Sequence, residues 1–111
     1  MRIIDTGITK EILTGDNHPQ LKIGDKLYTV DNRQSTWDKI QKTQANEELS
    51  IEEKNDEIFE LALGAEASKE IKEMDLPVEN YNYLTFCVMG AIIGEDPKEL
   101  QKLSKETARK N

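Results

Sequence analysis

The fold is decided by residues 55–100, which read NDEIFELALGAEASKEIKEMDLPVENYNYLTFCVMGAIIGEDPKEL. In this stretch, residues typical of helix ends and starts follow one another directly, with no long loop between them. An acidic amphipathic segment stops at Gly64, Leu76-Pro77 interrupts a short second segment, and an apolar third segment stops at Gly94. Glycine ends helices because it adopts the left-handed conformation easily, and proline lacks the N–H donor that a helix interior needs. The run therefore predicts three consecutive helices and the start of a fourth.

Capping signals fix the expected ends of the helices. Ser50 and Glu53 match the capping box, in which each side chain accepts a hydrogen bond from the backbone N–H of the other residue. Asp96 and Pro97 are typical of an N-cap and a first helical position, and Ser35 is a further candidate N-cap. The expected helices are 35–46, 51–64, 65–74, 78–93 and one that begins at residue 97.

The apolar spacing of these segments predicts which side chains face the core. Residues three or four apart share one face of a helix, and segment 78–93 is apolar over most of its circumference, so we expect it to be central. The side chains expected to face inward are Trp37, Ile40 and Gln44; Ile51, Ile58, Phe59, Leu61 and Ala62; Ala67, Ile71 and Met74; Tyr81, Leu84, Thr85, Phe86, Val88, Met89, Ile92 and Ile93; and Leu100, Leu103 and Ala108.

The first 34 residues carry strand signals instead. Segments 20–23 and 26–30 flank Gly24-Asp25, and glycine at the first position of a two-residue loop suits a type II′ turn. A third strand could come from residues 2–5 or 8–13, and residues 14–19 are expected to form a loop. Alternation predicts Leu21 and Ile23 on one face, with Leu27 and, depending on register, Thr29, and it places Tyr28 and Val30 on the other.

The expected fold class is α+β, with an N-terminal β-hairpin, or a small antiparallel sheet, followed by a compact bundle of four to five α-helices. A chain of 111 residues is one domain by the usual size relation. We expect a single domain over 1–111, made of a hairpin region at 1–34, a helical region at 35–108 and a frayed tail at 109–111.

Charge is distributed unevenly and bounds the class of partner. The net charge is −7, yet residues 51–99 hold 4 basic side chains against 13 acidic ones, while residues 100–111 hold 4 against 1. A protein that binds a duplex must neutralise phosphates, and the acidic middle would repel them. The basic residues near the end complement the dipole of a last helical turn. Nucleic acid is therefore not an expected partner.

Several absences point to the cell interior. No apolar run approaches the roughly 18 residues of a membrane-spanning helix, and the first residues lack the apolar region of a signal peptide. The single Cys87 has no partner for an intrachain disulfide. We expect a cytoplasmic protein that does not associate with a membrane.

Residues with catalytic chemistry are few. His18, the one histidine, lies in a polar Asn-His-Pro segment, and Cys87 lies in the most apolar helix, where a thiol is usually a small buried hydrophobe. Neither supplies enough ligands for a zinc site, and calcium-binding and phosphate-binding loop patterns are missing. We expect no catalytic, metal-binding or cofactor-binding residues, and no enzymatic activity.

Two sets of surface residues have both a structural and a functional interpretation. The carboxylates Glu52, Glu53, Asp56, Glu57 and Glu60 suit a solvated helix face, or a docking surface for a basic partner. The aromatic residues Trp37, Tyr81, Tyr83 and Phe86 could anchor a partner, although core packing is the better interpretation of Phe86. Because Tyr81 and Tyr83 are two residues apart on one helix, we expect one to be buried and the other exposed.

The same region resembles a known family. The relevant features are residues 60–67 (ELALGAEA), Ile71 and Leu76, the apolar helix 81–93, and residues 94–99 (GEDPKE). Over about residues 50–103 this order is similar to the second half of the small tail assembly chaperones of long-tailed phages and prophages of Gram-positive bacteria. That family typically has Gly-x-x-Pro-Glu-Glu at the last motif, and this chain departs from it at Lys98.

The resemblance implies a non-catalytic protein of the bacterial host cytoplasm. Such a protein binds the long helical tape measure protein and keeps it soluble while tail tube subunits assemble around it. Family members are often made in two lengths by a programmed frameshift, and this chain could be the shorter product. No motif assigns the contacts. The candidate partner-binding residues are Phe59, Tyr81, Tyr83 and Leu103.

Two other functions fit parts of the sequence. An acidic regulatory protein could present carboxylates in place of phosphates and so block a nucleic-acid-binding surface, and its binding would weaken steeply with salt. An enzyme would require turnover that is lost when His18 or Cys87 is replaced by alanine. The open edge of the hairpin also makes self-association conceivable.

Overall fold

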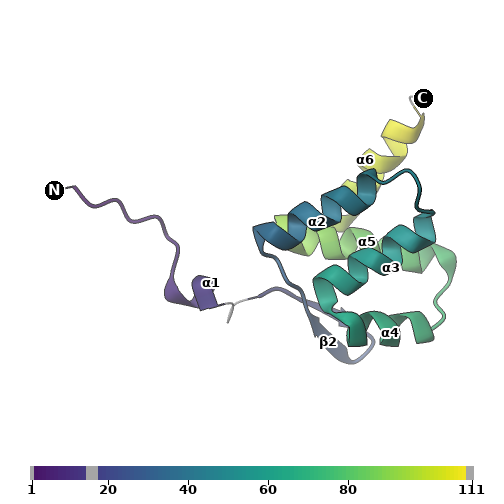
Figure 1. The fold of residues 1–111 in the computed structure, drawn as a ribbon, viewed down its shortest axis with the longest axis horizontal. Helices are drawn as coiled ribbons and strands as arrows, with labels where there is room; N and C mark the ends of the chain where they lie inside the picture. Colours follow the sequence, from purple (N-terminus) through teal and green to yellow (C-terminus); the bar gives the residue numbers. More distant parts are fainter. Residues whose placement is uncertain (1, 15–17, 110–111) are drawn as a thin grey trace.

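The computed structural model describes residues 2–14 and 18–109, with residues 105–109 described by their backbone alone. An N-terminal hairpin precedes a bundle of helices, which confirms the α+β fold class (Figure 1). The elements are α1 (Lys10–Thr14), β1 (Gln20–Ile23), β2 (Lys26–Thr29), α2 (Gln34–Ala45), α3 (Ile51–Leu63), α4 (Ala65–Glu73), α5 (Val78–Ile93) and α6 (Pro97–Arg109).

Helices α3 and α5 form the centre of the body. α2 and α4 pack on α3, whereas α6 and β1 pack on α5. The expected central position of α5 is confirmed by these contacts. The buried hydrophobic side chains come from the hairpin, α2, α3, α4 and α5: Tyr28, Val30, Ile40, Ile58, Phe59, Ala62, Ile71, Val88 and Met89.

The helix ends predicted at Ser50, Gly64 and Gly94 are confirmed. The Ser50 side chain accepts from the Glu53 N–H at 3.1 Å, and the Glu53 carboxylate accepts from the Ser50 N–H at 3.0 Å, so the capping box is complete. Gly64 separates α3 from α4 with φ +96°, and Gly94 ends α5 in the left-handed conformation. These positions favour glycine because other residues are strained there.

The hairpin is confirmed, but its faces were predicted wrongly. Gly24 has φ +62°, as the first position of a type II′ turn requires. The two-residue turn pairs Leu21 with Tyr28 and Lys22 with Leu27. Tyr28 therefore shares the core-facing side with Leu21, while Leu27 lies on the other face and is exposed. The register fixed by the turn decides this, because paired residues project to the same side of a hairpin.

Three further expectations are wrong. α2 begins at Gln34 with Arg33 as its N-cap residue, so Ser35 lies inside the helix. Ile51, Met74, Ile93 and Leu103 were expected to face the core, but their side chains are exposed to solvent. Residues 2–5 and 8–13 form no strand, since residues 10–14 are helical, and β1 and β2 are the only strands in the described ranges.

Parts of other expectations lie outside what the structure describes. Residues 15–17 of the expected loop belong here, and so do Lys110 and Asn111 of the expected frayed tail. The side chain of Ala108 is also outside the described part.

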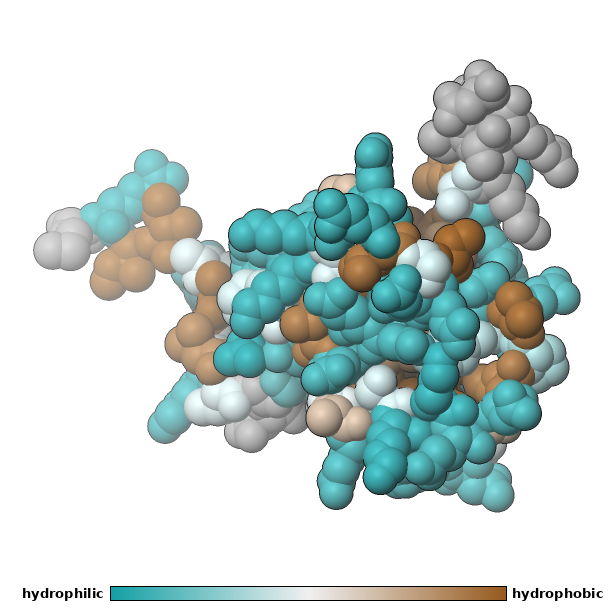
Figure 2. Space-filling model, turned by 45° about the vertical axis from the view of Figure 1, so that its right-hand side comes forward, coloured by the Kyte–Doolittle hydropathy of each residue, from teal (hydrophilic) through white to brown (hydrophobic). Residues whose placement is uncertain are grey.

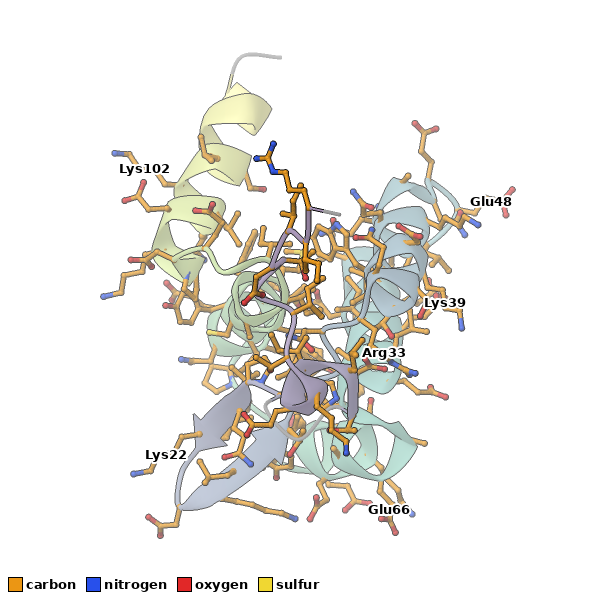
Figure 3. The ribbon with its side chains drawn as sticks, turned by 90° about the vertical axis from the view of Figure 1, so that its left-hand side faces the viewer. Lys22, Arg33, Lys39, Glu48, Glu66 and Lys102 are labelled. Atoms are coloured by element: carbon orange, nitrogen blue, oxygen red, sulfur yellow. The ribbon has the colours of Figure 1, made fainter. Side chains whose placement is uncertain are left out.

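Charged side chains surround the body on all sides. Lys22 on the hairpin, Glu66 on α4, Glu48 before α3 and Lys102 on α6 point away from the core in different directions (Figure 3). The core is therefore lean, and each contact between helices carries a large share of the stability of such a small domain.

The start of α2 depends on Asp31. Its carboxylate accepts from the Arg33 guanidinium at 2.8 and 2.9 Å and from the Thr36 hydroxyl at 2.8 Å, while its own N–H donates to the Ala62 carbonyl at 2.8 Å. The Arg33 guanidinium, with help from Thr36, holds the pKa of Asp31 well below its usual range. Asp31 thus joins the hairpin, α2 and the end of α3.

Replacing Asp31 by asparagine is expected to lower the free energy of unfolding at pH 7 by about 1–2 kcal/mol, which is below the usual contribution of hydrogen bonds to a charged group because the Arg33 side chain is exposed to solvent. Because the pKa is lowered in the folded state, this contribution is complete above the ordinary Asp pKa of about 3.9 and is lost as pH falls below it. Urea titrations between pH 7 and pH 3 measure it. The difference from the parent protein should shrink below pH 4, whereas the exposed control Asp25→Asn should differ little at any pH.

The turn between α5 and α6 approaches α5 closely at Gly90. The Gly94 and Glu95 N–H groups both donate to the Gly90 carbonyl, at 2.8 and 3.0 Å. A Cβ atom at Gly90 would lie 2.5 Å from the Glu95 carbonyl oxygen and 3.3 Å from the Pro97 ring. Glycine at this position therefore lets α6 fold back against α5.

Gly90→Ala is expected to destabilise the protein by about 1–3 kcal/mol, the usual cost of overpacking. In an unconstrained helix the same change stabilises by about 1 kcal/mol, so the sign of the effect is diagnostic. Urea unfolding of Gly90→Ala, with the exposed α5 substitution Asn80→Ala as control, measures it. Stabilisation by Gly90→Ala would show that the turn does not constrain α5.

Candidate functional site

The strongest candidate site is a cleft where the first turns of α3 and α5 meet the end of α4. Its volume is about 340 Å³. α3 contributes Ile51 and Glu52, and α5 contributes Val78, Tyr81 and Asn82. The lining is completed from the C-terminal side of α4 by Lys72, Asp75 and Leu76.

Two exposed aliphatic residues give the cleft its apolar character. Ile51 is 69% exposed and Val78 is 78% exposed, although each begins a helix whose later turns are buried. Both are first helical residues, directly after the Ser50 and Pro77 caps, so their side chains lie at the edge of the core. Leu76 between them is half-buried and packs against the core. The result is an apolar surface open to a partner.

A charged network closes one side of this surface. The Lys72 ammonium contacts Glu52 at 2.5 Å and Asp56 at 3.1 Å, and it lies 5.3 Å from the centre of the Tyr81 ring. The Tyr81 hydroxyl donates to Asp56. These carboxylates raise the pKa of Lys72, and burial together with Asp56 raises the pKa of Tyr81. Both groups keep their protons near neutral pH, which suits ionic contact rather than proton transfer.

A buried polar bridge holds α3 against α5 beneath the cleft. The Thr85 hydroxyl donates to the Asn55 side-chain oxygen at 2.6 Å, and the Asn55 amide donates to the Asn82 side-chain oxygen at 2.8 Å. Asn55 and Thr85 are buried, and Asn82 lines the cleft. An amide buried in this way fixes one arrangement of the two helices, because any other arrangement leaves polar groups without partners.

The four partner-binding residues predicted from sequence do not form one site. Tyr81 lines the cleft, where its ring packs edge-on against Phe59 at a centroid distance of 5.1 Å. Phe59 is fully buried, so its side chain belongs to the core and offers no surface. Tyr83 lies elsewhere on α5, and Leu103 is 58% exposed on α6. Tyr81 and Tyr83 are both half-buried, which corrects the expected division into one buried and one exposed ring.

Sequence reasoning missed the apolar edge of the cleft. Ile51 was assigned to the core, Leu76 was interpreted as part of a helix break, and Val78 was interpreted only as the first residue of the apolar helix 78–93. The exposure of Ile51 and Val78 could have been predicted from their position, because an aliphatic residue that directly follows a helix N-cap lies outside the first buried turn of that helix. Periodicity alone gives such a residue the same weight as one in the middle of a helix.

The other reactive side chains lie apart from the cleft. His18 Nδ1 lies 2.7 Å from the Asn32 side-chain oxygen. Cys87 is half-buried in α5, and burial raises the pKa of its thiol. Among the side chains that the structure describes, in residues 2–14 and 18–104, no group of three or more His, Cys, Asp and Glu is arranged to hold a metal ion.

Comparisons of the chain with protein-family models, with curated proteins and with solved structures found no match. Among the helices that the structure describes, none combines the length and the apolar character needed to cross a membrane.

Asn55→Ala is expected to lower the free energy of unfolding by about 1–3 kcal/mol, because it leaves the Thr85 hydroxyl and the Asn82 side chain without their buried partner. Thr85→Val should destabilise for the same reason. Since the two changes break one bridge, the double variant should lose less than the sum of the single variants. Urea unfolding of all four proteins tests this, and strict additivity would show that the bridge does not act as a unit.

Proposed function

We propose that the protein is a non-catalytic tail assembly chaperone that binds the tape measure protein in the cytoplasm of a bacterial host. In this role it holds the tape measure protein soluble while tail tube subunits assemble around it. The observation that carries the proposal is the apolar cleft edged by Ile51 and Val78 and flanked by charge. The resemblance over residues 50–103 adds the class of partner.

A helical partner suits the shape and chemistry of this cleft. An amphipathic helix binds a groove by placing aliphatic side chains from successive turns in contact with it. Ile51, Leu76 and Val78 supply the apolar surface, and Glu52 with Lys72 supplies a charged border. Such a border suppresses wrong registers and keeps the complex soluble. Bound client would therefore lose its exposed apolar stripe while the acidic outer surface remained in water.

The pairing of acidic side chains supports docking of a helix over mimicry of nucleic acid. A mimic needs carboxylates that are available to a basic surface. Here Lys72 engages Glu52 and Asp56, and Lys26 contacts both oxygens of Glu70 at 2.6 and 2.8 Å. The carboxylates nearest the cleft are thus partly neutralised within the chain. A non-catalytic role is supported by the raised pKa values of Tyr81, Lys72 and Cys87, which disfavour bases and nucleophiles at neutral pH.

The test is co-expression with the tape measure protein of the same genome. The parent chain should raise the soluble fraction of that protein and co-purify with it in salt of about 0.5 M, because apolar contacts resist screening. Val78→Asp and Ile51→Asp should abolish both effects. Each places an acid in the first turn of a helix, where the dipole favours it, so the fold should persist.

Leu27→Asp is the matched control, since Leu27 is an exposed aliphatic residue on the hairpin, outside the cleft. It should retain full rescue. If the Val78→Asp and Ile51→Asp variants still keep the tape measure protein soluble, its binding site lies outside the cleft. Absence of rescue and of any complex with the parent chain would overturn the proposed function.

A further inference from the structure

Residues 2–14, here called the arm, carry the largest gathering of exposed aliphatic side chains in the described chain. The arm projects from the body and contributes to a longest dimension of 55 Å (Figure 1). Its large aliphatic side chains are 55–87% exposed and appear as hydrophobic surface at the left of Figure 2. They are Ile3, Ile4, Ile8, Ile12 and Leu13. Exposed apolar surface of this density is typical of a segment that binds something.

Local hydrogen bonds shape the arm. The Asp5 carboxylate accepts from the Gly7 N–H at 2.9 Å, and the Thr6 hydroxyl accepts from the Ile8 N–H at 3.2 Å. The Thr9 hydroxyl accepts from the Ile12 N–H at 3.4 Å at the start of α1. These contacts turn the backbone but bury none of the aliphatic side chains. The arm is therefore shaped locally and leaves its apolar surface for another contact.

The cleft offers the surface that the arm lacks. Residues 2–4 of the arm place the cation Arg2 next to two aliphatic side chains, Ile3 and Ile4. The cleft places apolar Ile51 and Val78 beside Glu52, Lys72 and Asp75. Lys72 pairs with Glu52, so the negative charge of the lining that remains for a cation is that of Asp75. The apolar and charged parts thus match in kind and in sign. We infer that residues 2–4 of one copy dock in the cleft of a second copy of this chain.

The geometry favours a second copy over the chain's own cleft. Ile12 and Leu13 border a hollow at Leu61 and Leu63, so the arm leaves the body beside the C-terminal end of α3. The cleft lies at the opposite end of α3, and a helix of 13 residues is about 20 Å long. From its point of departure the arm extends away from the body (Figure 1). Two copies related by a two-fold axis could exchange arms, so that the arm of each copy fills the cleft of the other.

This inference concerns the cleft itself and does not depend on the client proposed above. It rests on the exposed arm, the apolar lining and the matching charges. A dimer formed in this way would cover in each copy the surface that a client would use. Client and arm would then compete for one site.

The experiment measures the mass of the purified full-length chain by sedimentation velocity over a range of concentrations. The parent chain should form a dimer. An arm variant, Ile3→Asp with Ile4→Asp, and a cleft variant, Val78→Asp, should each weaken dimerisation by about ten-fold or more, because each would bury an unpaired charge. Leu27→Asp should dimerise like the parent chain. Circular dichroism confirms that each variant is folded.

Mixing the two variants gives the sharpest result. The arm variant retains an intact cleft, and the cleft variant retains an intact arm, so the mixture should form a heterodimer through the one remaining contact. A parent chain that stays monomeric would overturn the inference, as would a dimer that persists in both variants. The second outcome would point to another interface, such as the open hairpin edge. No client is present, so failure here leaves the proposed function untouched, and failure of client rescue leaves this result untouched.

Discussion

The packing of α3 against α5 holds the body of this protein together, because α2 and α4 rest on α3 while α6 and β1 rest on α5. Apolar contact supplies the driving force, through Ile58 and Phe59 of α3 and Val88 of α5. Apolar contact alone would allow the two helices to slide. The buried bridge from Asn55 to Thr85 and Asn82 selects one alignment, since a shift by one turn would leave buried polar groups unpaired. That alignment also brings Ile51 and Val78 to the same edge of the body, so the candidate site follows from the packing.

Local chemistry could be predicted from the sequence, whereas the relation between elements could not. The capping box at Ser50, the stops at Gly64 and Gly94 and the turn at Gly24 are determined by residues within a few positions of each other. The burial of Tyr28 instead depends on which face of the hairpin meets α5, and a one-residue change of register would reverse it. The start of α2 was misplaced for a similar reason. Asp31 organises that start through Arg33 and Thr36, and it is itself held by the Ala62 carbonyl at the end of α3.

The candidate site shows the same division. Tyr81 was a candidate from sequence because aromatic residues are common at binding surfaces, and it lines the cleft. Phe59 had equal standing but fills the centre of the core. The sequence around Phe59 could not show that Phe59 is buried while Tyr81 reaches the cleft, because the burial of each ring depends on where α5 crosses α3. Ile51 and Val78 needed the same information, since a first helical residue is exposed or buried according to what lies beyond the end of the helix.

An apolar cleft on an acidic chain raises the question of how the protein stays soluble, and the proposed docking of the arm would answer it by covering the cleft. An exposed cleft favours non-specific association, which a covering segment prevents. Ordering an extended segment costs conformational entropy, so a short stretch that contributes two aliphatic side chains binds weakly. The client proposed above would be a helix that is already ordered along its length and offers aliphatic side chains over several turns. It would displace the arm without any change in the body, because the two differ in the apolar area that they bury and in the entropy that they lose on binding.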